Sequence, residues 1–291
     1  MNIIDYLILI SVLLSATIQG IFAKEYFVKS KNGSPIMYSL VTVTFALVWF
    51  VVSGIGSLDF SNILAYLPYS LLFALAYGLS TVGSKCALKH GPMALGTLFG
   101  ACSLLIPTFL GIFILGDPML PLSRWIGLGI LLLSLAIANL KKEDARITFL
   151  WVLFVALNIL GNGFCSFTQA AQVKFQNGQY GNEFMITALA FVAIVMAVFA
   201  FRNGQDAKVQ LSNKKLWVFG VLAGIANGYT NMMVMLLVSR NVPQSVIQPT
   251  VSAGGLVLTL LAAVILYKEK QSTAKYVSFA LGAVSLILLN I

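Results

Sequence analysis

The stretch ATIQGIFAKEYF, residues 16–27, follows an apolar run and carries a glutamine and a lysine, Gln19 and Lys24. The same polar ending returns in SFTQAAQVKFQN, residues 166–177, where Gln169 and Lys174 take the corresponding places. The two copies lie 150 residues apart in a chain of 291. This spacing predicts that the chain contains two copies of one unit.

Three further matches follow in the same order along the chain. AYGLS (76–80) corresponds to ANGYT (226–230) at an offset of 150, whereas HGPMAL (90–95) and SLAIANL (134–140) correspond to NVPQSV (241–246) and SLILLNI (285–291) at 151. Apolar runs resemble each other by chance, but four ordered matches at a nearly constant offset are much harder to obtain. We therefore predict an internal duplication, with repeats over residues 1–145 and 146–291.

The composition places the chain in a membrane. It is 59% hydrophobic and 9% charged, whereas soluble domains carry about 25% charged residues. Its apolar runs reach the roughly 20 residues that a helix needs to cross a bilayer. We predict an all-α polytopic protein of ten transmembrane helices, at about residues 3–23, 35–54, 64–84, 93–115, 123–140, 147–171, 184–201, 215–238, 245–267 and 273–291. Because five spans per repeat is an odd number, the second repeat should be inverted in the membrane.

The net charge of +9 is explained by topology, without a nucleic-acid partner. Fifteen of the eighteen Lys and Arg residues fall in the odd-numbered loops between these spans or in the first three residues of the span that follows. Basic residues collect in short cytoplasmic loops. The bias therefore predicts that the odd loops are cytoplasmic and that both termini lie outside. The short loops suit a multi-pass protein of the bacterial plasma (inner) membrane.

The end of each predicted repeat resembles a known family. ILGDPMLPLSRWIGLGILLLSLAI (114–137) and ILYKEKQSTAKYVSFALGAVSLILLNI (265–291) look like the last span of EamA-type repeats, in which a Leu-Gly-acid turn precedes the helix. The acid positions are taken by Asp117 and by Glu269, which is displaced by about one residue. The resemblance covers the whole chain in span order and duplication. It implies membership of the drug/metabolite transporter superfamily, whose members carry small organic solutes, and it says little about which solute.

Uncharged polar residues inside the spans are the candidate solute ligands. In the sixth span, Asn158, Asn162, Gln169 and Gln172 fall within a sector about 80° wide, and Asn227 and Asn231 lie one turn apart in the eighth. We predict that the substrate-binding residues are Gln19, Tyr77, Asn158, Asn162, Gln169, Asn227 and Asn231. The alternative is that such amides only join helices, and for Gly220 and Gly224 we expect helix packing.

Charged residues near the span ends are candidates for a gate. Lys24 and Lys174 occupy equivalent places in the two repeats, and the alternative for each is a lysine whose amine reaches the membrane surface. Proton coupling would need an acidic carrier, for which Glu25 and Glu183 are the candidates. The alternative for both acids is a solvated charge at a helix end.

Nothing in the sequence predicts catalysis, a cofactor or a metal site. The sole histidine, His90, is placed in a loop, and the three cysteines have neither disulfide nor zinc spacing. We therefore expect a secondary transporter of a small, polar, amino-acid-like metabolite, working by alternating access between membrane faces. A lipid or polyprenyl-phosphate translocase of the same architecture is the alternative. The expected partners are a small-molecule solute and membrane lipid.

Overall fold

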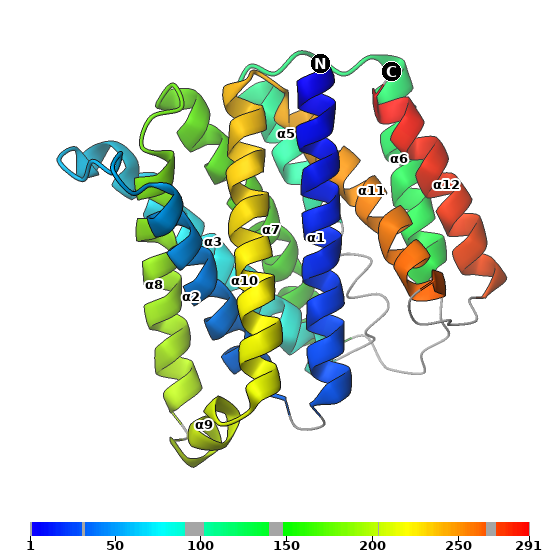
Figure 1. Cartoon of the computed structure of the whole chain (residues 1–291). Helices are drawn as coiled ribbons and strands as arrows, with labels where there is room; N and C mark the ends of the chain where they lie inside the picture. Colours follow the sequence, from blue (N-terminus) through cyan, green and yellow to red (C-terminus); the bar gives the residue numbers. More distant parts are fainter. Residues whose placement is uncertain are drawn as a thin grey trace. The chain divides into compact units, whose positions relative to one another are not determined.

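The protein is helical throughout the part of the chain that can be described. The computed structural model describes residues 2–30, 33–90, 102–139, 148–202, 204–265 and 272–290. Every regular element in these ranges is a helix (Figure 1). The first half of the predicted fourth span, and Glu269 of the resemblance, lie outside the described residues.

Seven of the described helices are long and apolar enough to cross a membrane, which makes the chain a polytopic integral membrane protein. They are α1 (Ile3–Lys29), α2 (Pro35–Ser53), α3 (Ile63–His90), α7 (Phe149–Phe175), α8 (Gly181–Phe201), α10 (Lys214–Ser239) and α12 (Thr273–Asn290). The remaining helical elements are η1 (Cys102–Leu104), α5 (Leu105–Phe113), α6 (Leu122–Asn139), α9 (Gly204–Leu211) and α11 (Gln244–Ile265). That ten helices cross the bilayer stays a prediction.

The sequence explains where several helices begin. In α2, Ser34 accepts a hydrogen bond from Met37 N at 3.3 Å, and Pro35 takes the first helical position, where its missing N–H costs nothing. In α10, Asn213 accepts from Lys215 N at 3.0 Å. The turn between α7 and α8 needs positive φ, which Asn177 supplies at 51°.

Two boundaries differ from prediction. The predicted loop at 202–215 contains the short helix α9, which packs against α2, α8 and α10. His90, predicted to lie in a loop, is instead the last residue of α3, so its loop placement is wrong. The helical pattern of α3 persists past the apolar run because the transition from apolar to polar residues does not itself end a helix.

The helices form two compact units, and each draws on both halves of the sequence. Unit 1 comprises residues 1–74 and 172–240, and unit 2 comprises residues 75–171 and 241–291. These units are defined by packing, whereas the boundary at 145/146 describes a duplication of sequence. That boundary stays a prediction.

In unit 1, α10 packs between α1 and α2, and α2 also packs against α8 (Figure 1). Three glycines one turn apart on α10 allow the close approach to α2. A Cβ added to Gly224 would lie 2.6 Å from Thr42 O, and one added to Gly220 would lie 2.8 Å from Val41 Cγ1. This confirms the expectation that Gly220 and Gly224 serve helix packing. The third glycine, Gly228, faces Trp49.

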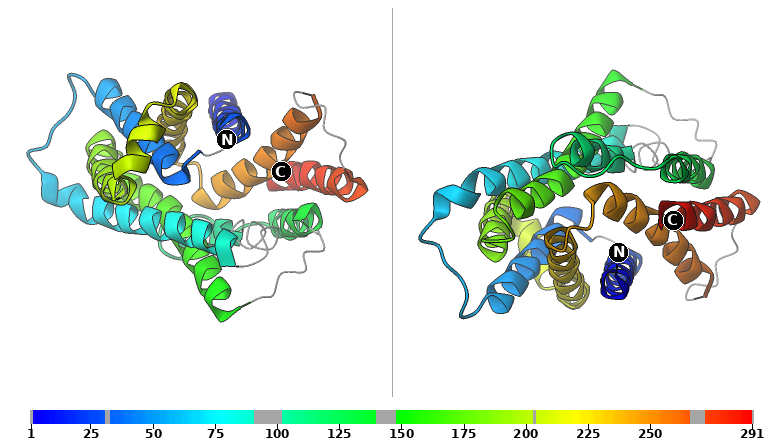
Figure 2. Two further views of the ribbon diagram at one scale, coloured as in Figure 1. Left: turned by 90° about the horizontal axis from the view of Figure 1, so that it is seen from below. Right: turned by 90° about the horizontal axis from the view of Figure 1, so that it is seen from above.

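In unit 2, α6 and α12 lie side by side, and α11 packs against α5, α6 and α12 (Figure 2). Serine hydroxyls join α6 to α12. Ser134 Oγ donates to Ser278 O at 2.7 Å, and Ser285 Oγ donates to Gly127 O at 2.8 Å. These serines are buried. Hydroxyls at a membrane helix interface are stable only when such partners satisfy them.

Candidate functional site

In unit 2, the predicted amides of α7 form a network with α3. Ser80 Oγ lies 2.8 Å from Asn162 Oδ1 and 3.2 Å from Asn158 Oδ1, and Asn162 Nδ2 donates to Asn158 Oδ1 at 3.0 Å. Asn158 is buried, whereas Asn162 is exposed. One side of this network therefore has no protein covering it. Ser80 is not among the predicted site residues.

The network lies where α3 and α7 cross at close range. A Cβ added to Gly83 would lie 2.6 Å from Asn158 N, and one added to Gly161 would meet the backbone of Ser80. There is no room for a solute between the two helices at this level. Any ligand of Asn162 must therefore approach from the exposed side of the amide pair.

In unit 1, Asn227 and Asn231 of α10 form a second pair of amides, one helical turn apart and joined by a hydrogen bond. Asn231 Nδ2 donates to Asn227 Oδ1 at 3.2 Å and to Asn227 O at 2.9 Å, and both side chains are half-buried. Between them in sequence, on the other side of α10, Tyr229 OH donates to Ser11 Oγ at 3.0 Å, and the ring of Trp49 on α2 meets Tyr229 edge-on. Residues 227–231 of α10 thus carry two amides on one face and a hydrogen-bonded tyrosine on the other.

The glutamines of α7 differ in their surroundings. Gln172 is fully buried, and its Nε2 donates to Gln179 O at 2.7 Å, which holds the turn into α8. Gln169, the other predicted glutamine of α7, is 3% exposed.

Two predicted ligands lie on other helices. Gln19 is half-buried on α1, and Tyr77 is half-buried on the part of α3 that belongs to unit 2.

A polar cavity of about 330 Å³ opens at the end of unit 1 where the predicted even-numbered loops lie. Its lining includes Ser57, Asn182, Glu183 and Ser239. Glu183 is only 5% exposed, and its Oε1 accepts a hydrogen bond from Asp59 N at 2.7 Å. Glu183 does lie in the first turn of α8, as the alternative of a helix-end charge expects, but protein covers most of its side chain. It is a buried carboxylate on the wall of a polar cavity.

The other charged candidates lie along their helices. Glu25 forms an ion pair with Lys29, one turn further along α1, with Nζ and Oε2 2.5 Å apart. Such a pair keeps the charge of Glu25 balanced locally. Lys24 and Lys174 are half-buried, and Lys174 lies in the last turn of α7 rather than in a loop.

Asp59 lies outside the helices, and its pKa is lowered from the ordinary value of an aspartate. The hydroxyl and backbone N–H of Ser61 hold the pKa of Asp59 below its ordinary value, because both hydrogen bonds favour the ionised carboxylate. The backbone bond, from Ser61 N to Asp59 Oδ1, measures 2.9 Å.

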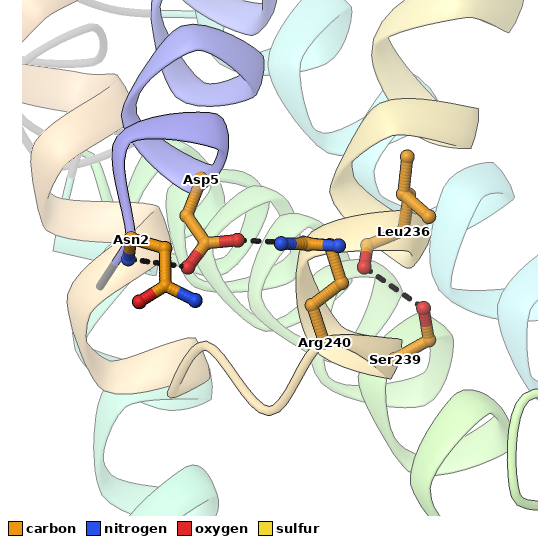
Figure 3. A network of polar contacts seen from close by, with 5 residues as sticks. All are labelled: Asn2, Asp5, Leu236, Ser239 and Arg240. Atoms are coloured by element: carbon orange, nitrogen blue, oxygen red, sulfur yellow. Dashed lines mark hydrogen bonds and ion pairs between the residues drawn. The ribbon is translucent and has the colours of Figure 1, made fainter.

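A charge contact between two helices was not foreseen from the sequence. Arg240 Nε and Asp5 Oδ1 are 2.6 Å apart and join α1 to the end of α10 (Figure 3). The other carboxylate oxygen of Asp5 accepts from Asn2 N at 2.8 Å, which caps α1. The available signal was that Arg240 is one of only three basic residues in the even loops or at the start of the span that follows. Its ion pair gives a structural reason for that position.

No family model matches the chain, and no curated protein matches it. Its fold is similar to that of a solved structure described as "Crystal structure of protein", with a TM-score of 0.76 and 14% sequence identity, over 99% of this chain and 96% of that one. At this identity the likeness concerns the fold alone.

Proposed function

We propose that the protein is a secondary transporter that moves a small, polar, amino-acid-like metabolite across the membrane by alternating access. Ten transmembrane helices would form two inverted five-helix repeats, as in the EamA-type family of the drug/metabolite transporter superfamily. Inverted repeats are the usual construction of alternating-access carriers. The proposal includes a bacterial plasma-membrane location with both termini outside.

A pair of related hydrogen bonds between α6 and α12 supports the duplication on which the proposal is built. Ser134 and Ser285 lie 151 residues apart, and so do their acceptors Gly127 and Ser278. The bond from Ser134 to Ser278 O therefore becomes the bond from Ser285 to Gly127 O when the two halves are exchanged. The same offset relates the bounds of α6 to those of α12, since both helices have 18 residues. Such reciprocity is expected where two copies of one unit pack about a local two-fold axis.

Other helix pairs follow the same rule. α2 packs against α8, and α5 packs against α11. In each pair the partners correspond to each other at the offset of 150 or 151 residues. These contacts support a duplication whose copies pair with each other within the compact units.

The chemistry of the candidate ligands indicates a polar solute. Each amide offers both donors and acceptors, which suits a neutral or zwitterionic ligand. Asn162 is exposed, and Asn231 is half-buried. An uncovered amide in a membrane helix is costly against lipid, so we place these groups on a water-filled path. The carboxylate of Glu183, in its polar cavity, suits a proton or a cationic amino group.

Counterflow in proteoliposomes tests the function directly. Saturable exchange of a labelled metabolite from a panel of amino acids, nucleotide sugars and sugar phosphates is expected. Binding can be followed by the rise in melting temperature that a ligand of the folded state produces by mass action. Movement of labelled lipid without solute counterflow would contradict the proposal and support the lipid translocase instead.

Two classes of variant separate binding from packing. Asn162→Ala and Asn231→Ala should abolish the ligand-induced rise in melting temperature while changing the melting temperature of the free protein little. Ser134→Ala is the matched control, because it removes a buried hydrogen bond between helices. It should lower the melting temperature of the free protein and keep the ligand-induced rise. If the asparagine variants behave as the serine variant does, the amides serve packing and not transport.

A further inference from the structure

An apolar groove of about 390 Å³ runs along the surface of unit 1 between α2 and α8. Its walls include Leu40, Phe45, Ile194, Ala197, Phe201 and Trp217. Ile194 is 62% exposed, and Phe201 and Trp217 are 48% and 41% exposed. On α8 the groove extends from Ala193 to Phe201, which is about 12 Å at the helical rise.

The lining offers almost no polar group to a ligand. Thr44 is the polar side chain that lines it, and its hydroxyl already donates to Leu40 O at 2.8 Å. The indole N–H of Trp217 donates to Leu211 O at 2.8 Å, at the end of the groove where α9 lies (Figure 1). A ligand of this groove is therefore held by apolar contact alone along its length.

Three basic residues lie close in sequence to Phe201, Leu211 and Trp217, which line the groove. Arg202 follows Phe201 directly, Lys208 lies on α9, and Lys214 begins α10 three residues before Trp217. All three side chains are exposed. They fall in the predicted odd loop of residues 202–214, on the side that the charge bias assigns to the cytoplasm. A groove that is apolar along its length and cationic at one end complements an amphiphile with an anionic head.

We propose that this groove binds one acyl chain of an anionic phospholipid, whose phosphate is held by Arg202, Lys208 and Lys214. Anionic lipids are concentrated in the cytoplasmic leaflet, and basic pockets between membrane helices recognise their headgroups. The lipid stays bound at the side of unit 1 and is not the transported solute. The proposal does not depend on which metabolite the protein carries.

Native mass spectrometry of the full chain tests the site. The protein is released from micelles that contain phosphatidylglycerol or phosphatidylcholine with identical acyl chains. We expect phosphatidylglycerol to be retained preferentially. Replacing the three basic residues by Gln should weaken its binding by about fivefold for each residue removed, and should leave phosphatidylcholine unaffected. Equal retention of the two lipids, or unchanged retention by the Gln variant, would overturn the proposal.

A second variant tests the groove itself. Ala197→Trp fills the groove, and we expect it to lose bound phosphatidylglycerol. Val198→Trp is the matched control, because Val198 is 68% exposed on the same helix and does not line the groove. Inorganic phosphate alone should neither bind nor stabilise the protein. Retention of phosphatidylglycerol by the filled variant, or binding of free phosphate at the same basic residues, would show that the acyl chain plays no part.

Discussion

The close contact between α10 and α2 predicts how replacing a glycine of α10 by alanine changes the stability of the protein. A Cβ at Gly224 would lie 2.6 Å from both Thr42 O and Phe45 Cβ. Because the first of these atoms belongs to the backbone, the added methyl can fit only if the helices separate. A Cβ at Gly20, on α1 of the same unit, meets nothing within 4 Å. The two sites therefore form a matched pair.

The expected difference can be estimated. In a helix interior, Gly→Ala gains about 1 kcal/mol of helix propensity at either site. Overpacking a close contact costs about 1–3 kcal/mol. We therefore expect Gly224→Ala to be less stable than Gly20→Ala by about 1–3 kcal/mol. Gly220→Ala should lie between them, because its nearest neighbours are side-chain atoms of Val41 that can shift.

Equilibrium unfolding of the purified protein in mixed micelles, titrated with a denaturing detergent, measures these differences. The folded state is followed by helical circular dichroism and by the exposure of Trp49, which lies on α2 beside Gly228. If Gly224→Ala is as stable as Gly20→Ala, then α2 and α10 do not pack as closely as described, and the account of unit 1 is wrong.

Two other perturbations test polar contacts of unit 1. Asp5→Asn and Arg240→Met should each lower the unfolding midpoint, because each change leaves one charge without its partner. The double variant should lose less stability than the sum of the two single losses. Additive losses would contradict the ion pair. Ser61→Ala should raise the pKa of Asp59 toward its ordinary value. Since the native pKa of Asp59 is depressed, its stabilising contribution is present above the unfolded pKa of about 3.9 and is lost as the pH falls through the native value. The unfolding midpoints of wild type and Ser61→Ala should therefore converge in strong acid, and a constant difference from pH 7 to pH 3 would refute the assignment.

Features encoded within one helix were accessible from the sequence. Asn158 and Asn162 are four residues apart, as are Asn227 and Asn231, and a helix places such residues on one face. Both pairs are hydrogen-bonded in the structure. The helical character of the apolar runs follows equally directly, because the backbone must satisfy its own hydrogen bonds inside lipid.

Features that depend on distant partners were not accessible. Glu183 accepts a hydrogen bond from the backbone N–H of Asp59, which is 124 residues away in the sequence. Arg240 forms its ion pair with Asp5, which is 235 residues away. Helix α9 has eight residues and no long apolar run. It was missed because its formation depends on packing, with Ala207 only 3% exposed.

The position of α10 between two neighbours limits how unit 1 can change shape. One side of α10 carries the glycines that touch α2, and the other carries Tyr229 and Ala226, which bond to Ser11 and Ser15 of α1. Turning α10 about its axis would drive side chains into α2 and break both bonds to α1. The three helices must therefore travel together. If the protein works as the transporter proposed above, spin labels placed on α1 and α2 would keep a constant separation during its cycle, and would supply a fixed reference distance for movements elsewhere in the protein.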